Sequence, residues 1–213
     1  MSAYEWGSSS IGVCRRWLLL EQNLLIGKAN VSAFLILIFS FCFGLSQKLA
    51  DLFDEHGWKG PKFLKVLLGI LWGIFGSILI IIDRYSSLVI TATVLYWLFR
   101  GKLDYTNHVV AGTLTLLVSI YQFSKYPELF IYLVILFIWF VLTGSAFSYL
   151  RRHFPDSCAL RLRLWIYVGP LIISFILGNF TPFLTVLFGM MGTELISYKY
   201  VASQKISGNP PLK

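Results

Sequence analysis

Charged residues are scarce in this chain. They make up 13% of its 213 residues, about half the share of a typical soluble domain. Acidic residues are the scarcer sign, with 10 Asp and Glu against 18 Lys and Arg. The shortage of charge excludes an ordinary soluble domain. The basic residues form no patch with base-stacking aromatics outside the apolar runs, so we exclude nucleic acid as a partner.

Cysteines and catalytic motifs are also few. The three cysteines form no CxxC pair, so we expect free thiols rather than a disulfide framework. The sequence contains no GxSxG run and no paired aspartate-rich motif. The apolar run after Arg16 ends at Glu21, so we expect no cleavable signal. These absences leave the cofactor unknown and point to no particular reaction.

Long apolar runs are what the chain has instead. Hydrophobic residues make up 57% of it and gather in stretches such as 31–45 and 131–144. A helix needs about 20 mostly apolar residues to cross a bilayer. We therefore predict an all-α, multi-pass integral membrane protein, a bundle of about seven transmembrane helices. The predicted spans are 29–48, 62–82, 84–100, 107–123, 128–148, 161–178 and 181–199.

These spans define one membrane domain, 29–199. An amino-terminal arm, 1–28, precedes it. We interpret part of this arm as an interfacial helix, with a partly inserted or disordered arm as the alternative. Residues 200–213 end in ISGNPPLK and are predicted to form a disordered cytosolic tail.

The basic residues set the predicted orientation. The loops after odd-numbered spans, together with the tail, hold 13 of the 18 Lys and Arg. The positive-inside rule then places the amino terminus outside and the carboxyl terminus in the cytosol. The cytosolic basic residues would contact anionic headgroups, so membrane lipids are the predicted partners. Plasma membrane and endoplasmic reticulum obey the same rule, and both fit.

Polar groups gather at the predicted cytosolic ends. No ionisable residue lies near the middle of a predicted span, which disfavours an ion-coupled transporter. Acidic, basic and imidazole side chains instead follow spans one, three and five, and Glu194 lies in the last turns of span seven. In a helical bundle these groups would converge on one cytosolic pocket.

The most suggestive pair is Asp104 and His108, four residues apart at the start of the fourth span. This spacing puts both side chains on one helix face, where the carboxylate could orient the imidazole as a general base. We therefore name them as the candidate catalytic residues. The competing interpretation is a helix start, with Asp104 near the positive dipole end and Asn107 or Thr106 as the cap. A metal would need a third ligand from Glu194, His56 or Asp54, and we predict no metal site.

Several residues at the same predicted cytosolic ends are candidates for binding a substrate or its phosphate group. The arginines among them suit phosphate best, because the guanidinium fork matches phosphate oxygens in pairs. The competing interpretation is that the basic ones only fix the topology. The candidate substrate- or phosphate-binding residues are Arg100, Lys102, Asn107, Arg151, Arg152 and Glu194.

Glycines and aromatics indicate how the helices pack. Gly69, Gly73 and Gly76 place small residues near one face of the second span, which favours close helix packing within the chain over a dimer interface. Whether the chain forms a homo-oligomer is left open by the sequence. Tyr96 and Trp97 lie near a span end, as in an interfacial aromatic belt, and we assign them no binding role.

Three functions remain after these exclusions. The first is a protein whose cytosol-facing polar pocket handles an anionic lipid headgroup or an isoprenoid phosphate. The second is an uncoupled permease for a small neutral or amphiphilic solute, using the helix break that Gly169 and Pro170 predict. The third is a non-catalytic membrane subunit or assembly factor that binds a protein partner through its cytosolic loops. Whether the protein is an enzyme stays open.

Overall fold

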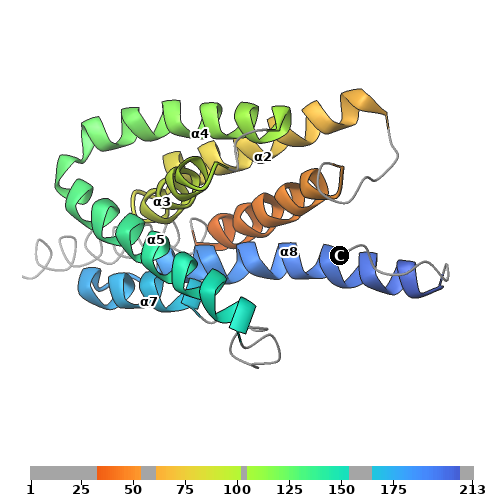
Figure 1. The fold of residues 1–213 in the computed structure, drawn as a ribbon. Coiled ribbons are helices and arrows are strands. Elements are labelled where there is room, and N and C mark those ends of the chain that lie inside the picture. The colour runs from red at the N-terminus through yellow and green to blue at the C-terminus, as the bar shows by residue number, and fades with distance from the viewer. Residues whose placement is uncertain (1–32, 54–60, 102–104, 154–164, 207–213) are drawn as a thin grey trace, which may run out of the picture. The chain divides into compact units, whose positions relative to one another are not determined.

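The computed structural model describes residues 33–53, 61–101, 105–153 and 165–206, and every regular element among them is helical (Figure 1). The elements are the helix Ala33–Phe53, α2 (Lys62–Ile82), α3 (Ser86–Phe99), α4 (Thr106–Lys125), the 3-10 turn η1 (Pro127–Leu129), α5 (Phe130–His153), α7 (Trp165–Leu177) and α8 (Thr181–Ile206). The predicted all-α class is confirmed for these residues. The predicted arm, 1–28, lies outside them.

Each predicted span corresponds to one helix, but three helices run at least five residues further than expected. Helix α5 ends at His153, five residues beyond the predicted end at 148. The helix Ala33–Phe53 continues five residues beyond the predicted end at 48. Helix α8 continues to Ile206, seven residues beyond the predicted end at 199 and into the predicted tail. The predicted ends lie where each apolar run stops, which is where the helix leaves the hydrocarbon layer. The hydrogen-bonded helix itself continues through polar residues that are good helix formers.

Three helices are long and apolar enough to cross a membrane: Ala33–Phe53, Phe63–Ile82 and Pro127–Leu150. Helices α3 and α7 are apolar but have 14 and 13 residues, or about 20 Å each at 1.5 Å per residue. The hydrocarbon core measures about 30 Å. The structure thus indicates a multi-pass membrane protein.

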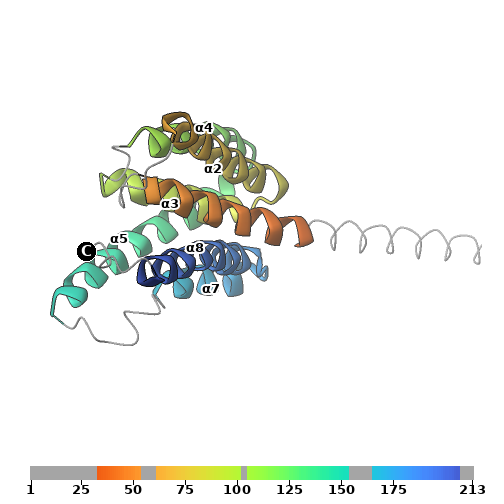
Figure 2. The same ribbon diagram turned by 90° about the vertical axis from the view of Figure 1, so that its right-hand side faces the viewer.

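Within the unit Ile36–Lys213, α2 lies beside α4 and α7 beside α8 (Figures 1 and 2). Helix α3 packs against α2, α4, α5 and α8. Its residues from Ser86 to Ala92 are all buried. A short helix therefore forms the centre around which longer helices pack.

Two buried apolar clusters form the core, and α3 contributes to both. The first joins α3, η1, α5, α7 and α8 and contains Leu88, Val89, Ala92, Leu129, Leu133, Leu136, Phe140, Ile173 and Val186. The second joins the helix Ala33–Phe53, α2, α3 and α4 and contains Ile36, Phe43, Trp72, Leu79, Ile80, Ile90 and Ala111.

The glycines of α2 permit its close approach to α4. A Cβ on Gly69 would stand 2.6 Å from the carbonyl oxygen of Asn107, and one on Gly73 would stand 3.0 Å from the Cα of Ala111. Backbone atoms cannot yield to such a group as a flexible side chain can. The prediction that these glycines pack within the chain is confirmed.

A buried polar stripe explains why α4 is less apolar than its neighbours. His108, Thr115, Ser119 and Gln122 are all buried on it. The Ser119 hydroxyl lies 2.7 Å from that of Thr91 on α3. In a bilayer such side chains turn toward other helices because lipid offers them no hydrogen bonds.

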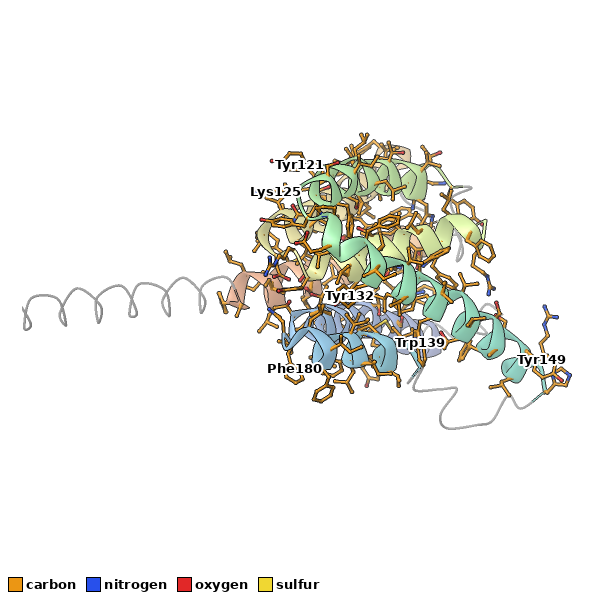
Figure 3. All side chains as sticks on the ribbon, turned by 90° about the vertical axis from the view of Figure 1, so that its left-hand side faces the viewer. Tyr121, Lys125, Tyr132, Trp139, Tyr149 and Phe180 are labelled. Atoms are coloured by element: carbon orange, nitrogen blue, oxygen red, sulfur yellow. The ribbon has the colours of Figure 1, made fainter. Side chains whose placement is uncertain are left out.

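Large apolar side chains cover much of the outer surface (Figure 3). Figure 3 places Tyr121 and Lys125 at one end of the helices and Tyr149 at the other. Both tyrosines are exposed. Such a surface suits lipid contact, with tyrosines near the two interfaces.

Candidate functional site

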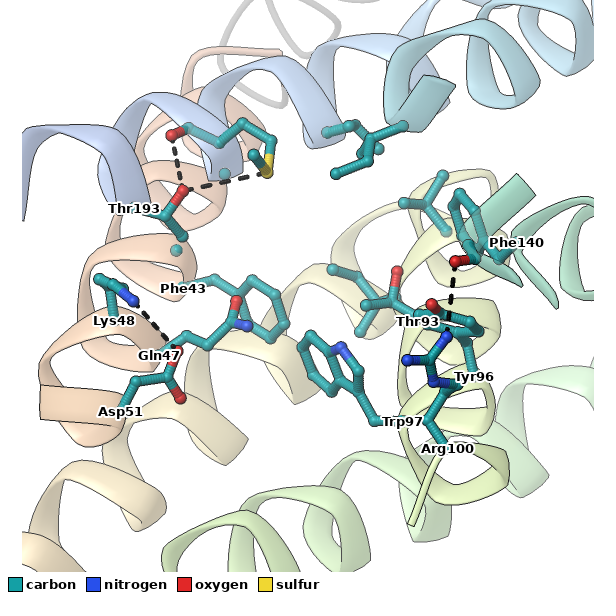
Figure 4. A pocket seen from close by; sticks show the side chains of 18 of the residues that line it. Phe43, Gln47, Lys48, Asp51, Thr93, Tyr96, Trp97, Arg100, Phe140 and Thr193 are labelled. Atoms are coloured by element: carbon teal, nitrogen blue, oxygen red, sulfur yellow. Dashed lines mark hydrogen bonds and ion pairs between the residues drawn. The ribbon is translucent and has the colours of Figure 1, made fainter. Parts of the chain in front are cut away.

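A cavity of about 560 Å³ lies among the helices of the unit Ile36–Lys213. Its walls come from the helix Ala33–Phe53, α3, α5 and α8, and the first residues of α4 and α7 complete them (Figure 4). This volume lies within the range of sites that hold one small ligand.

One end of the cavity is polar. Lys48 and Asp51 come from the last turns of the helix Ala33–Phe53, and Arg100 follows the last residue of α3. His108 lies in the first turn of α4. Figure 4 shows Lys48 and Asp51 on one wall and Arg100 on the opposite wall. Charged residues gather here because the apolar runs of these helices end at the same level.

The other end of the cavity is deeply buried and mainly apolar, although Thr185, whose hydroxyl lies 2.8 Å from that of Ser86, also lines it. Val89 and Ile90 from α3 are each 2% exposed, and Phe140 from α5 is 4% exposed. Val186, from the second turn of α8, is also buried. The cavity therefore changes from a charged mouth to an apolar interior.

His108 and Asp51 form a close polar contact at the mouth. His108 Nε2 lies 3.0 Å from Asp51 Oδ1, and Lys48 Nζ lies 3.8 Å from Asp51 Oδ2. The imidazole also meets Trp72 edge-on, with ring centres 5.2 Å apart. His108 Nδ1 is buried and has no hydrogen-bond partner in the part of the chain that the structure describes. This arrangement holds one nitrogen of the ring on a carboxylate and leaves the other buried without a partner among the described residues.

Asn107 is fully buried and does not line the cavity. Its Nδ2 donates to the carbonyl oxygen of Ala50 at 3.2 Å, and its Oδ1 accepts the His108 N–H at 2.9 Å. The N-cap residue of α4 is Tyr105, which makes no side-chain cap bond. Asn107 therefore satisfies a first-turn N–H that lacks a helical partner and ties α4 to the helix Ala33–Phe53.

Arg100 is exposed at the mouth. Its Nη1 donates to the Gly144 carbonyl oxygen at 3.4 Å and to the Ser148 hydroxyl at 3.3 Å. Both partners are neutral and both bonds are long. Among the described residues no carboxylate forms an ion pair with this guanidinium. Its charge is thus available to an anion.

The remaining predicted residues are not brought into the cavity by the structure. Glu194 is exposed on α8 and does not line the cavity, although its neighbour Thr193 does. Arg152 is exposed near the end of α5. Arg151 belongs to the same helix, but its side chain lies outside the described set.

Asp104 and Lys102 lie outside the described residues. The pairing of Asp104 with His108 therefore stays a prediction. In the described part of the chain, no three His, Cys, Asp or Glu residues cluster as metal ligands. Asp54 and His56, two candidates for a third ligand, are not among these residues.

The sequence analysis missed part of the wall. Tyr96 and Trp97 lie near the end of α3, as expected, but they line the cavity, whereas the sequence analysis assigned them no binding role. Gln47 also lines it, and so does Asp51, one helical turn further on. Tyr96 and Arg100 are likewise four apart, and such polar spacing near a helix end could have indicated a shared face.

The apolar helices and this cavity define the class of the protein: a multi-pass helical membrane protein with a polar-mouthed internal cavity. Comparison of the chain with protein-family models, curated proteins and solved structures finds no match.

Proposed function

We propose that this seven-span protein binds a phosphate-bearing amphiphile, an anionic lipid or an isoprenoid phosphate, in its cavity from the cytosolic side. One observation carries the proposal: the cavity joins an arginine without an acidic partner in the described chain to a deeply buried apolar interior. An amphiphile matches this arrangement, because its charged headgroup would lie at the arginine and its hydrocarbon chain in the apolar interior.

The headgroup contacts would supply most of the selectivity. Arg100 and Lys48 face the mouth from opposite walls (Figure 4), and charge-assisted hydrogen bonds to phosphate are about twice as strong as neutral ones. The apolar interior adds little free energy relative to the bilayer, because lipid tails are as apolar as the wall. It does exclude polar ligands, which would lose water there without gaining partners.

The positive-inside rule gives the orientation of this proposal. The mouth lies where the helix Ala33–Phe53, α3 and α5 end, and the predicted topology puts these ends in the cytosol. On the same proposal His108 and Asp104 are the candidate acid/base pair, with Asp51 orienting the imidazole.

The permease alternative needs a continuation of the cavity toward the opposite side. Buried hydroxyls of Ser86 and Thr185 lie 2.8 Å apart and join α3 to α8 near the starts of both helices. Gly169, beside the proline of α7, packs against the Trp139 ring and does not line the cavity. Both observations favour binding at a blind-ended site over passage.

Native mass spectrometry of the detergent-purified protein, with lipid extraction on the same sample, tests the proposal. We expect retained phospholipid or prenyl phosphate, and at least a roughly tenfold loss of it in Arg100→Gln, since a hydrogen bond to a charged group contributes about 1.5–3 kcal/mol.

Arg84→Gln is the matched control. Arg84 is exposed next to the start of α3, stacks on the rings of Tyr85 and Tyr126, and does not line the cavity. Equal lipid in both variants, or a wild-type protein without lipid, would contradict the proposal.

A further inference from the structure

The cavity has a measurable depth along two helices that start at the same level. Its lining residues run from Val89 on α3 to Arg100, which directly follows α3, and from Thr185 to Ser197 on α8. At 1.5 Å per residue, each of these stretches covers about 17 Å. The bond between Ser86 and Thr185 fixes the register of the two helices. The distance from the mouth to the deep end is therefore set by the register of the two helices, and the side chains at the deep end set where the cavity stops.

The deep end is closed by packed core. Val89 and Val186 line the cavity and also belong to the apolar cluster that contains Leu88, Leu136 and Ile173. These three neighbours are at most 2% exposed. Packed side chains of this kind cannot move aside for added atoms without strain. Val89 and Val186, together with the neighbouring Thr185, thus form a floor.

We infer that the cavity accepts one hydrocarbon chain, tail first, and that Val186 on its floor limits the length of that chain. This inference rests on the proposed function and names its ligand class: a phosphate amphiphile with a single chain, such as an alkyl or prenyl phosphate. A chain that reaches the floor before its phosphate reaches Arg100 loses the headgroup contacts. The cavity therefore discriminates between chain lengths, because only a short enough chain lets the phosphate form charge-assisted hydrogen bonds with Arg100.

A series of alkyl phosphates tests the inference. Octyl, dodecyl, hexadecyl and icosyl phosphate are added at equal mole fraction to the protein in nanodiscs, and occupancy is read by native mass spectrometry. For wild type, occupancy stays level with increasing length, because bilayer and cavity are equally apolar. It then falls about tenfold or more at a cut-off length, the effect of losing the hydrogen bonds to a charged group.

Two substitutions of Val186 should move the cut-off in opposite directions. Val186→Phe raises the floor and shifts the cut-off to a shorter chain, while octyl phosphate still binds as in wild type. Val186→Ala deepens the floor and shifts the cut-off to a longer chain. Because this variant removes side-chain volume, its result does not require the core to accept a larger ring. Val168→Phe is the control, because Val168 is 40% exposed on α7 and does not line the cavity.

The outcomes separate the two claims. If wild type binds neither an alkyl phosphate of any length nor phosphatidic acid, the proposed function is wrong. If wild type binds alkyl phosphates without a cut-off, or the cut-off stays in place in Val186→Ala, the single-chain site is wrong while the proposed function stands. Preference for a two-chain phosphatidic acid over every alkyl phosphate would also overturn the single-chain site.

Discussion

At the scale of single residues, the contact between His108 and Asp51 joins two helix ends at the mouth of the cavity. It joins the first turn of α4 to the last turns of the helix Ala33–Phe53, beside the buried Asn107 bond to Ala50. Both contacts hold the same two helix ends together. The geometry of the mouth therefore depends on residues that are not all in the cavity wall.

We predict that His108→Phe lowers the free energy of unfolding by about 1–3 kcal/mol, because it leaves the Asp51 carboxylate without its closest donor. Asp51→Asn retains an acceptor oxygen for the imidazole and should cost less than Asp51→Ala. Chemical unfolding in detergent, followed by circular dichroism, measures these differences. Equal stability of His108→Phe and wild type would show that the contact does not hold the two helix ends.

The sequence could place His108 near other polar groups, but it could not name Asp51 as its partner. The two residues are 57 positions apart on different helices. Spacing rules compare residues on one helix, so they found Asp104 at four residues. Asn107 shows the same limit: its polarity predicted a ligand contact, whereas its burial reflects packing between α2, α4 and the helix Ala33–Phe53.

At the scale of helices, the apolar runs predicted the positions of the elements well. They did so because each run must be hidden from water and each buried backbone group must be paired within its own helix. The runs could not predict that α3 is central. That position follows from its small buried Ser86, Ser87 and Ala92, which permit several helices to approach it.

The predicted orientation is testable at the helix ends. In a background without cysteine, Lys125→Cys at the end of α4 should react with an impermeant maleimide from outside sealed vesicles of known orientation. Tyr198→Cys on α8 should react only after permeabilisation. Both positions are exposed in the structure, so access to the reagent depends on the side of the membrane. The reverse pattern would contradict the amino-out topology and move the cavity mouth to the other face.

At the scale of the whole molecule, the unit Ile36–Lys213 separates an apolar outer surface from a cavity with a charged mouth. The two core clusters flank this cavity: Phe43 and Ile90 of one, and Phe140 and Val186 of the other, all line it. Ligand binding between two packed halves is a general way to build a site on rigid supports.

The most direct test of this account is photolabelling in nanodiscs with a dodecyl phosphate that carries a diazirine at the end of its chain. Labelled residues are mapped by peptide mass spectrometry, with and without excess unlabelled dodecyl phosphate. The account predicts saturable labelling of the deep wall, near Val89 and Val186, that competitor removes. Labelling confined to outward residues such as Leu117 and Phe175, which are 61% and 67% exposed, and unaffected by competitor, would contradict it.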